Sequence, residues 1–120
     1  MREIKFRAWD KERRIMYYPK ILGFDYNGDL IFIDTNNEYL NHTRDSSFIK
    51  LMQYTGIKDK NGKEIYEGDI VLQTVSNKKF IVKYDYDWCG FSPFISCYQG
   101  YKVYKVIGNI YENPELLEGK

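Results

Sequence analysis

The chain has 120 residues, 43% of them hydrophobic and 18% aromatic, with twelve tyrosines and only three prolines. This length and composition predict one compact domain with a modest core, and they exclude a disordered or low-complexity chain. A net charge of +1 gives no bulk electrostatic argument for a nucleic-acid or membrane partner. The excess of Tyr and Phe, which favour half-buried pleated surfaces, predicts a β-rich fold.

The amino-terminal sequence indicates where the protein acts. Residues 1–5 lead into alternating charges without the apolar core of a signal peptide, and no stretch approaches the roughly 20 apolar residues of a membrane-spanning helix. We therefore expect a cytoplasmic protein with no membrane partner, in which Cys89 and Cys97 are reduced. Residues 1–20 carry seven Lys and Arg against three Asp and Glu, so one face near this end is expected to be locally basic.

The first predicted element is a half-buried strand, because apolar and polar residues alternate over Glu3–Trp9. One face carries Ile4, Phe6 and Ala8, and the other carries Lys5, Arg7 and Trp9. A short strand over Met16–Tyr18 follows and ends at Pro19.

The next element is a hairpin centred on Asn27-Gly28. Asn-Gly favours a two-residue turn with positive φ at both positions, which would place Phe24 opposite Ile31 and Leu22 opposite Ile33. The polar residues 35–47 then predict an irregular connection.

The segment SFIKLMQY (residues 47–54) fits a buried strand or a short helix, and we favour the strand because a hairpin signal follows it. That signal is Asp59-Lys60-Asn61-Gly62. A two-residue turn would pair Lys58 with Ile65, whereas a type I turn followed by a left-handed Gly62 would pair Lys58 with Glu64. We expect the second register, because it sets opposite charges across from each other and pairs Ile57 with Ile65.

Further turns are predicted at Gly68-Asp69, where the glycine supplies positive φ and the aspartate accepts from nearby amides, and at residues 76–78. Alternation over residues 78–88 predicts one long strand, with Phe80, Val82, Tyr84, Tyr86 and Trp88 on one face. Strands are also expected over residues 91–98 and 101–107, and Asn113 before Pro114 predicts a short helix. The fold class is therefore all-β, a small antiparallel, SH3-like barrel built from hairpins with a short C-terminal helix. We expect a single domain over residues 1–120, with lobes at 1–47 and 48–113.

The sequence offers little for catalysis or metal binding. His42, the single histidine, lies in a polar segment without a nucleophile motif, and together with Cys89 and Cys97 it makes one ligand fewer than a structural zinc site needs. Asp85 and Asp87 would share one face of a strand, where a solvated surface is the favoured interpretation and a metal-dependent site the alternative. We assign no catalytic residue, metal or cofactor.

The best candidate for binding is a basic and aromatic face. Aromatic rings beside cations are typical of surfaces that bind single-stranded nucleic acid, although the same rings could instead fill the core. The candidate residues are Lys5, Arg7, Trp9, Lys83, Tyr84, Tyr86 and Trp88.

Three segments together resemble the YopX family of phage and prophage proteins: residues 5–10 (KFRAWD), residues 51–71, and residues 106–114 (VIGNIYENP). The resemblance covers almost the whole chain. It implies an all-β, barrel-like fold and a gene carried by a bacteriophage or prophage. It implies no activity and transfers no functional residues.

Three functions are compatible with these observations. The first is a non-enzymatic accessory protein that binds a host or phage protein through aromatic anchors. The second is a single-strand nucleic-acid-binding module, and the third is an enzyme that uses Asp85 and Asp87. Exposed sheet edges would also permit a homo-oligomer.

Overall fold

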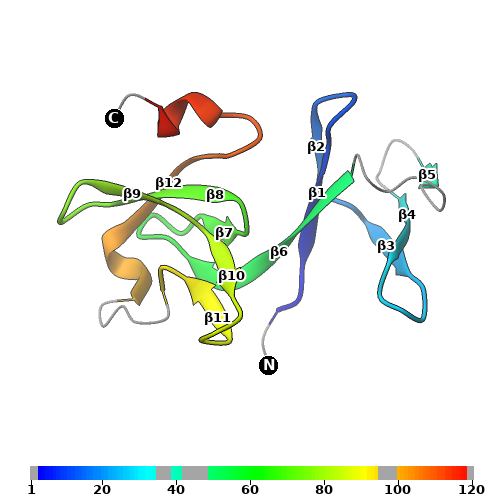
Figure 1. Ribbon diagram of the computed structural model, residues 1–120, viewed down its shortest axis with the longest axis horizontal. Coiled ribbons are helices and arrows are strands. Elements are labelled where there is room, and N and C mark those ends of the chain that lie inside the picture. The colour runs from blue at the N-terminus through cyan, green and yellow to red at the C-terminus, as the bar shows by residue number, and fades with distance from the viewer. Residues whose placement is uncertain (1–2, 35–38, 42–48, 95–99, 119–120) are drawn as a thin grey trace. The chain divides into compact units, whose positions relative to one another are not determined.

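The computed structural model describes residues 3–34, 39–41, 49–94 and 100–118 (Figure 1). Strands make up 54% of the structure and helices 6%, and the strand pairs within the described residues are antiparallel, so the all-β prediction is confirmed. The chain divides into a smaller unit, Phe6–Met52, and a larger unit, Met1–Lys5 with Gln53–Lys120. In the described parts of the chain, no helix is long and apolar enough to span a membrane. The predicted single domain with lobes 1–47 and 48–113 and its SH3-like character stay predictions.

The smaller unit consists of short strands around its own core. Its strands are β1 (Phe6–Asp10), β2 (Ile15–Tyr17), β3 (Ile21–Phe24), β4 (Leu30–Asp34), β5 (Tyr39–Asn41) and the first residues of β6 (Ile49–Lys58). β1 pairs with β2, and β3, β4 and β5 form a three-stranded sheet. The core contains Ala8, Tyr17, Ile33 and Ile49. β5 lies within the segment predicted to be irregular, so that prediction is wrong at residues 39–41.

β1 is not the half-buried strand that its alternation predicts. Arg7, Trp9 and Asp10 are as buried as Ala8, so both faces of the strand are covered. The Asp10 carboxylate accepts the backbone N–H groups of the next turn, from Glu12 and Arg13, each at 3.0 Å. The period-two pattern fails at Asp10 because these backbone N–H groups, rather than water, satisfy its buried carboxylate.

The described part of the larger unit contains the remaining strands and two single-turn 3₁₀ helices. They are the rest of β6, β7 (Glu64–Tyr66), β8 (Asp69–Gln73), β9 (Lys78–Ile81), β10 (Lys83–Asp85), β11 (Gly90–Ser92), η2 (Gly100–Val103), β12 (Tyr104–Asn109) and η3 (Pro114–Leu117). β8 lies between β12 and β9, while β6 pairs with β7 and β10 with β11. The core contains Ile65, Val71, Val82, Phe94 and Tyr104.

Two hairpin turns with the sequence Asp-x-Asn-Gly share one hydrogen-bond pattern. In the first, the N–H of Gly28 donates to the Asp25 carbonyl at 3.0 Å, and in the second, the N–H of Gly62 donates to the Asp59 carbonyl at 2.9 Å. Both glycines have positive φ, 89° and 86°. In each turn the aspartate carboxylate also accepts two backbone N–H groups, two and four residues further on, at 2.8 to 2.9 Å. In both hairpins, the side chain of Asp25 or Asp59 therefore stabilises a turn that is longer by one residue than a two-residue Asn-Gly turn.

The prediction for the second turn is confirmed for the pair of Lys58 with Glu64, and the register then shifts before Tyr54 pairs with Tyr66, so the pairing of Ile57 with Ile65 stays a prediction. The prediction for the first is half wrong: Phe24 lies opposite Leu30, not Ile31. A bulge between Gly23 and Phe24 then restores the expected pair of Leu22 with Ile33.

Asp59 also connects its hairpin to the last strand. The N–H of Val106 donates to Asp59 Oδ2 at 2.9 Å, and the N–H of Lys60 donates to the Tyr104 carbonyl at 3.0 Å. The Asp59 side chain is buried, which by itself would raise its pKa, but the N–H groups of Val106, Lys63 and Asn61 outweigh burial and lower the pKa below its ordinary value of 3.8. A folded state with this aspartate ionised is therefore favoured.

The remaining turn predictions hold and several element boundaries do not. Gly68 has φ of 86°, and Asp69 accepts the N–H of Tyr66 at 2.8 Å, as expected. The long strand predicted over residues 78–88 is interrupted at Val82 and ends at Asp85. The strand predicted over residues 91–98 covers only Gly90–Ser92, with residues 95–99 outside the described part. The final strand starts at Tyr104, because Gly100–Val103 forms a 3₁₀ turn.

The predicted C-terminal helix is the 3₁₀ turn η3. Pro114 occupies its first turn as expected, but the Asn113 side chain makes no cap. Instead Asn113 Oδ1 accepts the N–H of Asn109 at 3.2 Å, which ties the turn to the end of β12.

Candidate binding site

The hairpin of β10 and β11 presents a cluster of aromatic rings. Tyr84 pairs directly with Phe91 across the two strands. The Tyr84 ring lies edge-on to Phe91, with centroids 5.2 Å apart, and edge-on to Tyr86, with centroids 5.0 Å apart. Phe91 also packs against the core of the larger unit, so the cluster has a fixed base.

Asp85 ends β10 and shapes the turn. Its carboxylate accepts the N–H groups of Asp87 at 3.0 Å and of Trp88 at 3.3 Å, which replaces strand pairing by a local turn. Cys89 completes the turn with φ of 54°. Tyr86 and Trp88 consequently lie in a turn rather than on a strand face, and they are 84% and 72% exposed. Aromatic side chains this exposed add nothing to the core.

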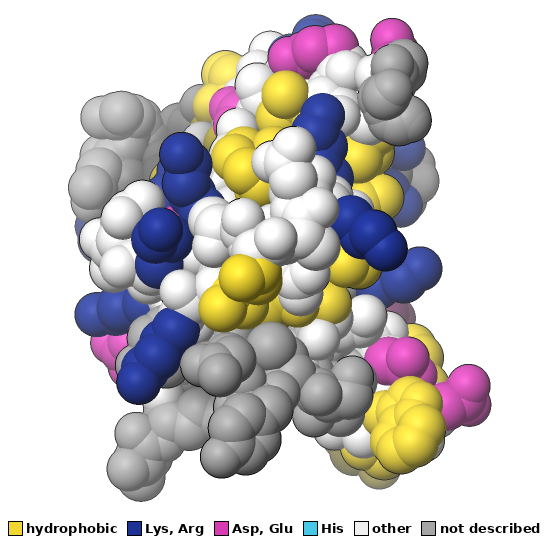
Figure 2. Space-filling view, turned by 90° about the vertical axis from the view of Figure 1, so that its left-hand side faces the viewer, with side chains coloured by type: hydrophobic (Ala, Val, Ile, Leu, Met, Phe, Trp, Pro, Cys, Tyr) yellow, Lys and Arg dark blue, Asp and Glu magenta, His cyan; other side chains and the backbone are white. Residues whose placement is uncertain are grey.

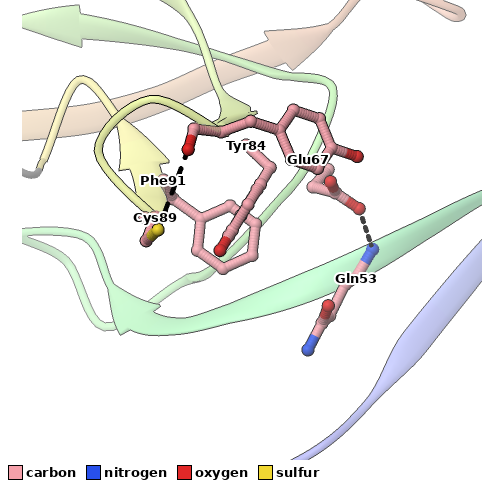
Figure 3. A pocket seen from close by; sticks show the side chains of 7 residues that line it. Gln53, Glu67, Tyr84, Cys89 and Phe91 are labelled. Atoms are coloured by element: carbon pink, nitrogen blue, oxygen red, sulfur yellow. Dashed lines mark hydrogen bonds between the residues drawn. The ribbon is translucent and has the colours of Figure 1, made fainter.

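A pocket of about 460 Å³ opens beside this hairpin (Figure 3). Its lining residues are Gln53, Glu67, Tyr84, Tyr86, Cys89, Gly90 and Phe91. The volume lies within the range usual for ligand sites. Figure 3 shows the Tyr84 and Phe91 rings together on one side, with Glu67 and Gln53 on the other. The site therefore joins β6, the turn after β7 and the β10–β11 hairpin within the larger unit.

Glu67 holds a defined position in the pocket wall. Its Oε1 accepts the backbone N–H of Gln53 at 2.7 Å. Among the seven described lining residues it is the only one with a charged side chain. The pocket thus combines aromatic walls with one carboxylate, a surface suited to a positively charged group rather than an anion.

The structure separates the seven residues proposed as a basic and aromatic face. Tyr84 and Tyr86 line the pocket, and Trp88 and Lys83 are exposed on the same hairpin. By contrast, Arg7 and Trp9 are buried in the smaller unit, with the Arg14 guanidinium 5.7 Å from the Trp9 ring. These two side chains are not presented at a surface.

Lys5 of the same proposed face is engaged in a local network. Its ammonium group bonds to Glu64 and lies 5.1 Å from the Tyr54 ring centroid. The hydrogen bond to Glu64 raises the pKa of Lys5, and burial followed by the charges of Glu64 and Glu3 raises the pKa of Tyr54. Lys5 therefore has a structural partner within the larger unit.

Among the other candidates for catalysis or metal binding, those that the structure describes are not brought together. Asp87 lies in the turn beyond the end of β10, so it does not share a strand face with Asp85 as the sequence predicts. Residues 42 and 97, the histidine and the second cysteine, lie outside the described part, and Cys89 is an exposed free thiol. In the residues that the structure describes, no group of three His, Cys, Asp or Glu side chains could hold a metal ion.

Sequence reasoning missed Gln53, Glu67 and Phe91 as site residues. They enter the pocket from segments 14 to 38 positions apart, and tertiary packing alone brings them together. The one usable signal was Cys89-Gly90, which marks a break directly after the aromatic run.

The described basic side chains of the larger unit do not form one continuous patch on the face seen in Figure 2. There the Lys and Arg side chains lie in separate groups with uncharged and apolar side chains between them. A phosphate backbone binds best along a continuous positive groove, which the visible described surface does not provide.

Comparisons with known proteins agree with this fold. A family model described as YopX protein matches residues 5–118. A crystal structure of protein EF1440 from Enterococcus faecalis is 31% identical and has a TM-score of 0.76, covering 98% of this chain and 100% of that one. A crystal structure of protein yopX from Bacillus subtilis is 22% identical with a TM-score of 0.59, covering 95% and 98%. None of the curated proteins compared matches the sequence.

Proposed function

The chain belongs to the YopX family, and we propose that it is a phage- or prophage-encoded accessory protein that binds a host or phage protein in the bacterial cytoplasm, without catalysis. One observation carries the binding role: Tyr86, 84% exposed, lines a pocket of about 460 Å³, and Trp88, 72% exposed, lies on the same turn. Tyr and Trp are the residues most enriched among the energetically dominant contacts of protein interfaces.

The hairpin is suited to this role because its base is rigid. Phe91 anchors it to the core, and the Asp85 carboxylate holds the turn, so Trp88 is presented with little loss of conformational freedom on binding. The packing of Phe91 against the core of the larger unit supports a preformed binding surface.

The nucleic-acid alternative receives less support. Of its proposed residues, Arg7 and Trp9 are buried and Lys5 bonds to Glu64. The carboxylates of Asp85 and Asp87 lie on the aromatic hairpin itself, where they would repel a phosphate backbone.

We expect partner capture to depend on the hairpin. Wild-type protein, a Tyr86→Ala/Trp88→Ala variant and a Tyr26→Ala variant would be used as baits in lysate of the bacterial host. Tyr26 is the matched control, since it is a fully exposed tyrosine in the turn of another hairpin. The double variant should bind the captured protein at least about tenfold more weakly, while Tyr26→Ala binds as wild type does.

Equal capture by all three baits would contradict the proposal. Oligonucleotide binding that falls steeply with salt, measured by fluorescence polarisation, would instead support the nucleic-acid alternative.

A further inference from the structure

We infer that the pocket beside the β10–β11 hairpin receives a cationic side chain, a lysine ammonium or arginine guanidinium, of the protein partner. The inference rests on the proposed function and names the chemistry that the site recognises. It follows from the arrangement of three rings and one carboxylate around the same hollow.

The rings stand nearly at right angles to one another. The Tyr84 plane makes angles of 72° with Tyr86 and 80° with Phe91. Rings arranged in this way cannot stack on each other, so part of their negative π faces is left for other contacts. A cation within about 6 Å of such a ring is attracted by its quadrupole.

Glu67 supplies the opposite charge at the other side of the hollow (Figure 3). The N–H of Gln53 donates to Oε1 at 2.7 Å, which fixes the orientation of the carboxylate. A cation between this carboxylate and the rings would combine a charge-assisted hydrogen bond with cation–π attraction. The remaining described lining residues are uncharged, so none of them opposes a positive ligand.

The surroundings of the pocket favour a side chain of a macromolecule. Trp88 is 72% exposed on the same turn but does not line the hollow. It is therefore placed to pack against the surface from which an inserted side chain would project. A charged group held among aromatic residues is a frequent anchor at protein interfaces, where Arg and Trp are both enriched.

The thiol of Cys89 gives a direct test, because it is exposed and lines the pocket. In a Cys97→Ser background, the labelling rates of Cys89 would be measured with two methanethiosulfonates, one carrying a trimethylammonium group and one carrying a sulfonate. The ratio of the two rates, divided by the same ratio for free cysteine, is independent of the reactivity of the thiol. We expect this ratio to favour the cationic reagent about tenfold.

Two variants assign the preference to the pocket. Glu67→Gln retains an oxygen that can accept the Gln53 N–H and removes the charge, so the ratio should fall several-fold. Asp87→Asn removes a charge from the same hairpin outside the lining and should change the ratio little. A ratio equal to that of free cysteine, or an equal effect of both variants, would overturn the inference.

An equilibrium measurement covers the case in which a variant folds poorly. Wild-type protein would be titrated with choline and with its neutral carbon isostere 3,3-dimethylbutan-1-ol, following the NMR signals of the Tyr84, Tyr86 and Phe91 rings. Saturable shifts with the cation alone support the inference, and equal shifts with both compounds overturn it.

The failure of this inference can be told from that of the proposed function. If the cation preference is absent while Tyr86→Ala/Trp88→Ala still loses the partner, the ligand class is wrong and the binding role stands. If the cation preference is present but Tyr86→Ala/Trp88→Ala captures the partner as well as wild type does, a partner side chain is not the occupant and the inference fails.

Discussion

We expect Asp59→Ala to lower the free energy of unfolding of the larger unit by about 3 to 5 kcal/mol. The Asp59 carboxylate, only 3% exposed, accepts the N–H groups of Asn61, Lys63 and Val106. Alanine would leave these donors without that acceptor and would release the hairpin from β12. Urea unfolding followed by amide signals of the larger unit would measure the change.

Asp25→Ala is the matched control. Asp25 has the same place in the other Asp-x-Asn-Gly turn and accepts two of the corresponding N–H groups, but it is exposed. Water can replace an exposed acceptor, so the expected loss is only about 0.5 to 1 kcal/mol. Equal losses for the two variants would show that Asp59 acts only within its turn.

The Asp59 carboxylate also makes the free energy of unfolding depend on pH, and this free energy should decrease as the pH falls. Because the pKa of Asp59 is lower in the folded state than its ordinary value of 3.8, its contribution is complete above that value and is lost as the pH falls through the folded pKa. Asp59→Asn cannot titrate. The stability difference between wild type and Asp59→Asn should therefore shrink below about pH 4. A difference that stays constant down to pH 2 would contradict the assigned cause.

The second large effect is expected from Ile70→Ala, which should cost about 3 to 4 kcal/mol. Ile70 is fully buried in β8, the central strand of its sheet, opposite Gly108 on β12 and Ile81 on β9. Gly108 has no side chain to fill the space left, and its Cβ position is already crowded by Asn113 and Leu116. The cavity would therefore remain largely open.

Ile81→Ala provides the comparison for this substitution. Ile81 is paired directly with Ile70 but is 37% exposed, so removing its side chain should cost about 1 kcal/mol or less. Urea unfolding of both variants, followed by the same amide signals, would measure the two losses in free energy of unfolding. Similar losses at the two positions would show that burial in β8 does not govern the stability of this sheet.

Hairpin positions could be predicted from sequence because their signals are local. The glycines of the three predicted turns all have the positive φ that these turns require: Gly28, Gly62 and Gly68. The first register is wrong because Asn27-Gly28 predicts a two-residue turn, whereas the chain forms a longer turn that begins at Asp25 and places Phe24 opposite Leu30. The aspartate two residues before each asparagine is the stronger signal, since its carboxylate selects the longer turn in both hairpins.

The limits of the strands were harder to predict, because alternation continues past the residue that ends the strand. Residues 84, 86 and 88 are all aromatic, yet the Asp85 carboxylate captures the next amides and diverts the chain. The same competition between the side chain and strand pairing explains why β1 ends at Asp10. Period-two patterns identify strands well and their ends poorly.

The candidate site could be predicted only in part. The aromatic run predicts Tyr84, Tyr86 and Trp88 as candidate binding residues. It does not show which of these rings are exposed, because exposed rings and core rings look alike in sequence. Glu67 gave no signal, since it belongs to a turn and reaches the pocket through its hydrogen bond to Gln53. The negative charge that Glu67 brings to the pocket is thus a property of tertiary packing.

The most direct test of the binding role is site-specific photo-crosslinking in the bacterial host. A benzophenone amino acid would replace Trp88 in one variant and Tyr26, which is also exposed, in another. The account predicts one discrete protein adduct from position 88, absent at position 26 and weakened by Glu67→Gln. No adduct at position 88, or the same adducts from both positions, would contradict it.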